Sequence, residues 1–258
     1  MPESFATQFW LCLSALAAGA VNSIAGGGTL LTFPALTAWV SYEAANATST
    51  VALVPGSVAA AWGYRREFAG LRRWALLLAG PSLVGGAVGT LLVIWFPDAF
   101  AALVPWLILA AALLFLLQPA LGRLRSAGKL RGEPTAGTRA AIAVFQFLVA
   151  VYGGYFGAGI GILMISSLSL MGTGTIHHMN ALKTLLAACI NGVSVVVWVL
   201  NHKVEWRFVP VMAGAAVVGG YFGARVARRL PRGVVRWVVI VIGFTLAAYY
   251  FSKQLAPP

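Results

Sequence analysis

The chain has 258 residues, of which 60% are hydrophobic and only 9% are charged, and its formal net charge is +12. A soluble domain carries about 25% charged residues, so this composition excludes a water-soluble globular protein and indicates a chain that lies in lipid. The basic residues gather in short loops between apolar stretches, which is the charge pattern of a membrane protein. The positive charge therefore does not indicate nucleic acid as a partner.

Ten apolar stretches predict an all-α, polytopic membrane protein. In chain order they cover residues 5–24, 29–42, 46–64, 74–95, 101–119, 140–157, 160–171, 178–200, 208–227 and 233–251. A membrane-spanning helix needs about 20 residues, so the stretches 29–42 and 160–171 are short for a full crossing. Each of these two directly follows a glycine-rich break in the apolar pattern.

The sequence also repeats itself at a shift of 134 residues. Gly27 falls on Gly161, Asn46-Ala47 on Asn180-Ala181, and Thr50 on Thr184. A Gly-Gly-x-x-Gly motif at 85–89 falls on the same motif at 219–223. Duplicated apolar halves with glycine breaks are typical of secondary transporters, whose substrate binds where the two repeats meet. We divide the chain into a first transmembrane repeat (1–119), a basic cytoplasmic linker (120–139) and a second transmembrane repeat (140–258).

The break in each repeat allows two topologies. If the break only interrupts one helix, each repeat crosses four times and the halves run parallel. If the break is the tip of a re-entrant hairpin, each repeat has five passes and the halves are inverted. The hairpin topology puts 14 basic residues on one side and three on the other, whereas the four-pass topology gives 12 and five. The positive-inside rule therefore favours inverted repeats with both termini in the periplasm.

The residues behind this count lie in the predicted loops or near the ends of the neighbouring apolar stretches. The 14 cytoplasmic residues are Arg65, Arg66, Arg72, Arg73, Arg123, Arg125, Lys129, Arg131, Arg139, Arg225, Arg228, Arg229, Arg232 and Arg236. The three on the other side are Lys203, Arg207 and Lys253. Lys183 lies within an apolar stretch and belongs to neither group.

The glycine breaks are candidate anion sites. A helix that starts at membrane depth leaves backbone N–H groups unpaired, which is tolerated where they line a cavity. The same helix start carries the positive end of the helix dipole and favours an anion. The predicted backbone site comprises Gly26, Gly27, Gly28 and Thr29 in the first half and Gly159 and Gly161 in the second. The glycines of the motifs at 85–89 and 219–223 are expected to allow close helix packing instead.

Polar side chains follow each break. Asn46 and Thr50 open the third stretch, and Asn180 and Thr184 open its counterpart; helix capping and substrate binding both remain open for them. Lys183 lies one turn into the 178–200 stretch, where a charge is costly and indicates function. The alternative for Lys183 is that its side chain reaches the membrane interface. Asn191 lies about two turns further along the same helix face, so both could line one path.

The sequence contains no catalytic motif. It has no Ser/His/Asp or Cys/His set, no HExxH motif and no Walker A loop, so we predict no enzyme activity, no catalytic residue and no cofactor. His177 and His178 are adjacent and do not share a helix face, and no Cys, Asp or Glu stands near them, so we predict no metal site. All six acidic residues lie in or beside predicted loops, unlike the mid-membrane carboxylates of proton pumps.

Two pairs of motifs resemble those of one family. They are Ala-Gly-Ala-Val-Asn-Ser-Ile-Ala-Gly-Gly-Gly-Thr-Leu-Leu-Thr-Phe-Pro-Ala-Leu (18–36) with Asn-Ala-Thr-Ser-Thr (46–50), and Gly-Gly-Tyr-Phe-Gly-Ala-Gly-Ile-Gly (153–161) with Asn-Ala-Leu-Lys-Thr (180–184). With Gly-Gly-Tyr-Phe-Gly-Ala-Arg (219–225), they resemble the sulfite exporter TauE/SafE family, also called the 4-toluene sulfonate uptake permeases. The resemblance implies transport of sulfite, organosulfonates or related anions across the bacterial inner membrane.

These observations together predict an inner-membrane secondary transporter or exporter of a small sulfur-containing anion. It would work by alternating access, with Lys183 supplying the positive charge at the repeat interface. The expected partners are the anion and the lipid bilayer, and a homodimer remains open. The alternatives are a cation or metal permease and a non-transport membrane protein of sulfur metabolism. An inside-negative potential favours anion export by about 2.3 kcal/mol per charge per 100 mV, so export would need no coupling ion.

Overall fold

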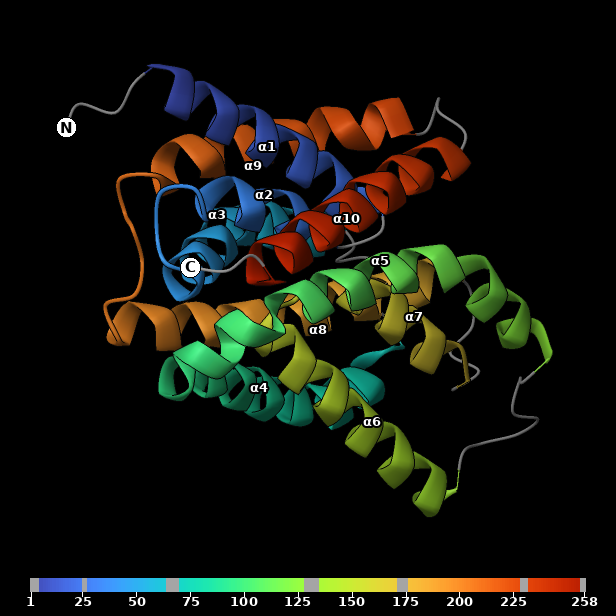
Figure 1. The fold of residues 1–258 in the computed structure, drawn as a ribbon. Helices are drawn as coiled ribbons and strands as arrows, with labels where there is room; N and C mark the ends of the chain where they lie inside the picture. Colours follow the sequence, from blue (N-terminus) through green and yellow to red (C-terminus); the bar gives the residue numbers. More distant parts are fainter. Residues whose placement is uncertain are drawn as a thin grey trace.

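The computed structural model describes residues 5–24, 27–63, 70–127, 135–170, 176–227 and 232–255, and its regular elements are all α-helices (Figure 1). The helices are α1 (Phe5–Ile24), α2 (Thr29–Leu36), α3 (Tyr42–Gly63), α4 (Arg72–Trp95), α5 (Pro97–Ala127), α6 (Ala136–Tyr155), α7 (Ile160–Leu170), α8 (Ile176–Leu200), α9 (Val209–Ala227) and α10 (Arg232–Leu255). The prediction of an all-α chain is confirmed.

Five of these helices are long and apolar enough to cross a membrane, judged by length and composition: α4, α5, α6, α8 and α10. The helices α2 and α7 have 8 and 11 residues. At 1.5 Å per residue they extend about 12 and 17 Å, whereas the hydrocarbon core of a bilayer is about 30 Å thick. The prediction that these two segments are short is confirmed, and neither helix spans a bilayer by itself.

Several predicted boundaries differ from the structure, and those of α3 and of the linker 120–139 bear on the site and the domain organisation. α3 begins at Tyr42, so Asn46 lies inside the helix and does not open it. The helix starts early because Ser41 Oγ accepts a hydrogen bond from the backbone N–H of Ala44 (3.4 Å), a helix-capping contact. α5 continues to Ala127 and α6 begins at Ala136, so helix fills much of the predicted linker 120–139. Leu, Arg and Ala favour helix in water as well as in lipid, and the apolar pattern therefore ends before the helix does.

Glycines allow the closest helix contacts. On α9, a Cβ atom at Gly219 would overlap the carbonyl group of Leu16 on α1, and on α4 a Cβ atom at Gly89 would overlap that of Val151 on α6. A Cβ atom at Gly85 would lie 2.6 Å from the carbonyl oxygen of Phe147. The predicted packing role is confirmed for these three glycines. The surroundings of Gly223 lie outside the described side chains.

The two halves of the chain pack into each other. α1 of the first half packs against α9 of the second, and α6 of the second half packs against α4 of the first (Figure 1). The 134-residue shift carries one of these pairs onto the other. It also relates the α3–α9 pair to the α8–α4 pair, and the α2–α3 pair to the α7–α8 pair. The halves are therefore interleaved and do not form separate domains.

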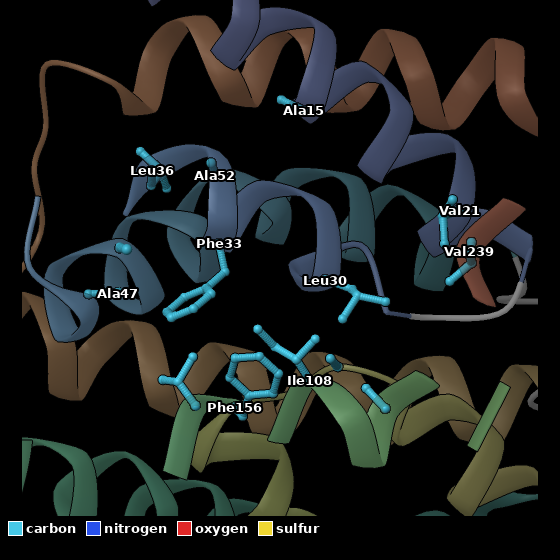
Figure 2. Close-up of a cluster of buried hydrophobic side chains, with 14 of the residues drawn as sticks. Ala15, Val21, Leu30, Phe33, Leu36, Ala47, Ala52, Ile108, Phe156 and Val239 are labelled. Carbon is cyan, nitrogen blue, oxygen red and sulfur yellow. The ribbon is translucent and has the colours of Figure 1, made fainter. Parts of the chain in front are cut away.

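A buried aromatic cluster holds the two halves together next to the breaks. Phe33 on α2 points toward Phe156, the residue after α6 (Figure 2), and their ring centroids lie 5.3 Å apart in an edge-to-face arrangement. Phe33 also contacts Phe100 on α5, with centroids 6.2 Å apart. Edge-to-face pairs contribute about 0.5–1.5 kcal/mol beyond area burial. This cluster fixes α2 against the start of the second break.

Candidate functional site

The two glycine breaks touch each other in the middle of the molecule. Gly27, between α1 and α2, has φ +124°, and Gly157 and Gly159, between α6 and α7, have φ +81° and +78°. Residues with a Cβ atom rarely adopt such positive φ values. A Cβ atom at Gly27 would also lie 3.0 Å from the backbone nitrogen of Gly159. Glycine is therefore required here both for the backbone turn and for the contact between the halves.

A cavity of about 110 Å³ lies beside the breaks. One water needs a space of about 10–15 Å³, so the cavity can hold several waters or a small ion. Eight residues of the predicted site line it: Gly27, Thr29, Thr50, Gly161, Asn180, Lys183, Thr184 and Asn191. They come from α2, α3, α7, α8 and the first break, so the fold gathers both halves of the chain around one space.

The other predicted residues lie elsewhere. Gly28 is buried, and a Cβ atom there would lie 2.6 Å from the carbonyl oxygen of Ala18. Gly159 is buried against Leu114 of α5. Asn46 is 1% exposed and donates a hydrogen bond from Nδ2 to the carbonyl oxygen of Tyr155 (2.9 Å), so it ties α3 to the end of α6. None of these three lines the cavity, and Gly26 lies outside the described residues.

Lys183 carries the charge of the cavity. It lies about two turns into α8 and is 9% exposed. Of the described residues that line the cavity, it is the one with an ionisable side chain, and within the described ranges its ammonium group has no hydrogen-bond or ion-pair partner. A buried charge is costly unless it is paired. The unpaired ammonium therefore favours the entry of an anion.

The neutral polar residues differ in what they can offer an anion. Thr50 and Thr184 donate their hydroxyl protons to the carbonyl oxygens of Asn46 and Asn180, each at 2.8 Å. A hydroxyl has one proton, so these two threonines present lone pairs to the cavity. By contrast, the side chains of Thr29, Asn180 and Asn191 have no hydrogen-bond partner within the described ranges. These three side chains and Lys183 can therefore donate hydrogen bonds to a ligand.

Backbone amides add to these donors at the second break. The N–H of Ile162 bonds the carbonyl oxygen of Gly159 (3.0 Å). The N–H groups of Ile160 and Gly161, at the start of α7, have no acceptor in the described part of the chain. Both residues line the cavity. The first amides of a helix have no partner within that helix and favour anions.

Sequence reasoning missed two polar lining residues, Asn22 on α1 and Ser57 on α3. Asn22 Nδ2 donates to Ser57 Oγ (3.4 Å), and Asn22 Oδ1 accepts the N–H of Gly27 (3.3 Å). The 134-residue shift carries Ser57 onto Asn191, so the repeat itself contained the signal for Ser57. Asn22 stands out as an amide within an apolar stretch.

The fold and the site define a class of protein. An all-helical, multi-pass membrane protein with two broken segments that meet at a polar cavity has the architecture of a membrane transporter. The family model of the sulfite exporter TauE/SafE matches residues 11–250, and the chain belongs to this family. It is a membrane transporter and not an enzyme, as its sequence predicts.

Curated relatives of the chain are also described as membrane transporters. The chain is 29% identical over 237 residues to the "Probable membrane transporter protein YfcA" of Escherichia coli (strain K12), covering 91% of this chain and 86% of the relative. It is 28% identical over 243 residues to a "Probable membrane transporter protein" of Haemophilus influenzae, covering 91% and 90%. A third relative, the "Probable membrane transporter protein ORF9" of a Sinorhizobium species, is 27% identical over 251 residues, covering 96% and 94%.

Proposed function

We propose that the protein is a secondary transporter of the bacterial inner membrane for a small sulfur-containing anion, with sulfite or an organosulfonate as the first candidates. The observation that carries this proposal is the buried ammonium group of Lys183, which lies at the cavity beside the breaks and has no partner among the residues that the structure describes. The family description supports sulfur as the central atom of the anion. A cation or metal permease is disfavoured, because Lys183 would repel its substrate.

The anion would be held by charge and by directed donors. Lys183 supplies the positive charge, and Thr29, Asn180 and Asn191 supply side-chain donors. The amides of Ile160 and Gly161 add the positive end of the α7 dipole. Thr50, Thr184 and the glycines of the breaks would shape the space around the anion. Export down an inside-negative potential would need no coupling ion.

Inverted repeats and alternating access form part of the same proposal. The first residues of α1, the last residues of α10 and the α8–α9 loop lie at one end of the bundle, and the end of α5 and the start of α10 lie at the other (Figure 1). Five passes per half would give this arrangement. The shift-related helix pairs agree with a pseudo-two-fold relation between the halves. The charge distribution of the loops would place the termini in the periplasm.

Two polar contacts join the halves at the proposed periplasmic end. Lys203 Nζ, in the α8–α9 loop, lies 2.9 Å from Glu43 Oε1 on α3. The backbone N–H of Glu205 donates to Thr48 Oγ1 (3.0 Å). Both contacts join the first half to the second. Periplasmic opening in an alternating-access cycle would break them, so they would favour the state in which this end is closed.

A binding screen tests the proposal. Purified protein in detergent would be titrated with sulfite, sulfate, thiosulfate, taurine, sulfoacetate and acetate, and its melting temperature measured. A ligand that binds only the folded protein stabilises it by about 2.7 kcal/mol at a concentration 100 times its dissociation constant. We expect sulfur-containing anions to raise the melting temperature more than acetate does. Stabilisation by divalent cations and by none of these anions would contradict the proposal.

A further inference from the structure

The second break is fixed by one tyrosine. Tyr152, in the last turn of α6, donates its hydroxyl proton to the carbonyl oxygen of Ala158 (2.7 Å). Its backbone oxygen accepts the N–H groups of Phe156 (2.9 Å) and Gly157 (3.2 Å). Tyr152 thus binds both the beginning of the segment 156–158, through its backbone oxygen, and the end of that segment, through its hydroxyl group. The hydroxyl bond is the part that a substitution can remove without altering the backbone contacts.

The first half holds its break in a different way. The 134-residue shift carries Tyr152 onto Ala18, which has no hydroxyl group. There, Asn22 Oδ1 accepts the N–H of Gly27 (3.3 Å). The hydroxyl bond of Tyr152 is therefore specific to the half that also carries Lys183.

Ala158, whose carbonyl oxygen accepts the hydroxyl proton of Tyr152, lies between two glycines. Ala158 is flanked by Gly157 and Gly159, both with positive φ, and glycine has the widest choice of backbone conformations. The next two amides, of Ile160 and Gly161, line the cavity without an acceptor in the described part of the chain. A break left free here would have to be ordered when a ligand binds, which lowers affinity.

We propose that Tyr152 is a positioning residue that orients the amides of Ile160 and Gly161 toward the bound anion. This inference rests on the proposed function. Tyr152 does not line the cavity. Its side chain lines an apolar groove between α4, α5 and α6, together with Leu148 and Val151. It therefore acts on the anion only through the backbone of the break.

The variant Tyr152→Phe tests this role, because it removes the hydroxyl group and keeps the ring. Asn46 still holds the carbonyl group of Tyr155 from α3, so the end of α6 stays in place and the variant is expected to fold. The matched control is Tyr249→Phe on α10, where the side chain is 57% exposed. Dissociation constants for the six compounds of the binding screen and hydrogen–deuterium exchange of the ligand-free protein would be measured for wild type and both variants.

We expect Tyr152→Phe to bind the anion about threefold to tenfold more weakly than wild type, as for the loss of one neutral hydrogen bond. Hydrogen–deuterium exchange should be faster at the amides of Phe156, Gly157 and Ile162. Exchange in the helices away from this break should be unchanged. Tyr249→Phe should match wild type in both measurements. Such a local change separates positioning from a general loss of stability, which would speed exchange throughout the bundle.

Two results would overturn the inference: exchange at residues 156–162 that equals wild type in Tyr152→Phe, or faster exchange there with unchanged affinity. If wild type binds none of the six compounds, the proposed function fails and the role in anion binding fails with it. Exchange in the ligand-free protein still decides whether the hydroxyl group fixes the break. The two failures are therefore distinguishable.

Discussion

At the scale of single residues, the proposed preference for an anion depends on Lys183. Its charge was visible in the sequence because an ammonium group within an apolar stretch is costly and rare. The sequence could not show whether the side chain faces the cavity or reaches the membrane interface. The structure places it at the cavity, 9% exposed and with no partner among the described residues. That position makes its charge available to a ligand.

Replacing Lys183 should therefore weaken anion binding. A hydrogen bond to a charged group contributes about 1.5–3 kcal/mol, so we expect Lys183→Ala and Lys183→Gln to weaken anion binding by about tenfold to more than a hundredfold. Lys183→Arg keeps the charge but replaces a compact ammonium with a planar fork, and its affinity should be intermediate. Titration calorimetry with sulfite measures all three. Lys253→Gln, at the exposed end of α10, is the control, and equal affinities for every variant would refute the role of Lys183.

Asn46 shows what residue patterns could not predict. The sequence placed it at a helix start with a capping or binding role, whereas it lies inside α3 and bonds the carbonyl oxygen of Tyr155. That contact joins positions 109 residues apart and depends on how the halves pack. Local patterns carry no information about such a partner. The same holds for Tyr152, whose hydroxyl contact depends on the backbone conformation of the break.

The glycines act at the scale of helices. The predicted packing use is confirmed for Gly85, Gly89 and Gly219, whereas the predicted anion-binding use of the glycines at the breaks stays a prediction. Glycines beside short apolar segments form the breaks, and glycines spaced four apart within long apolar helices form close contacts. The spacing predicted the second use because residues i and i+4 share a helix face. Helix ends were harder to predict, because α3 and α5 extend beyond the apolar pattern.

Two glycines on α9 provide a matched test of helix packing. A Cβ atom at Gly219 would overlap the carbonyl group of Leu16, whereas a Cβ atom at Gly214 would have no atom within 4 Å. Gly219→Ala should therefore force α1 and α9 apart and lower the free energy of unfolding by about 1–3 kcal/mol. Gly214→Ala should leave stability unchanged or raise it, since alanine favours helix. Melting temperatures in detergent compare the two, and equal values would show that the close α1–α9 contact does not stabilise the fold.

At the scale of the whole molecule, the repeat in the sequence predicted which distant parts of the chain come together. A shift of 134 residues pairs the breaks and the polar residues after them, and the structure brings residues of both halves to one cavity. The shift could not predict where the halves differ. Asn22 falls on Phe156 and Ser49 on Lys183. The two breaks are therefore held differently, and among the described residues that line the cavity only the second half contributes a charged side chain.

The proposed topology gives a test with two positions. We expect a cysteine at Ser252, near the end of α10, to react with a membrane-impermeant maleimide on spheroplasts. A cysteine at Ser126, near the end of α5, should react only after the membrane is broken. Cys12 and Cys189 would first be replaced by alanine to remove the native thiols. Protection of the cysteine at position 252 in intact spheroplasts would contradict periplasmic termini and the inverted five-pass arrangement.

Anion flux in proteoliposomes tests the central claim most directly. Vesicles with purified protein would be loaded with sulfite, and efflux followed while a potassium gradient and valinomycin set an inside-negative potential. The account predicts efflux that rises with the potential, since each charge gains about 2.3 kcal/mol per 100 mV. Vesicles with Lys183→Ala should lose sulfite no faster than protein-free vesicles. Equal efflux from wild-type and Lys183→Ala vesicles, or no efflux above protein-free vesicles for sulfite, taurine and sulfoacetate, would contradict it.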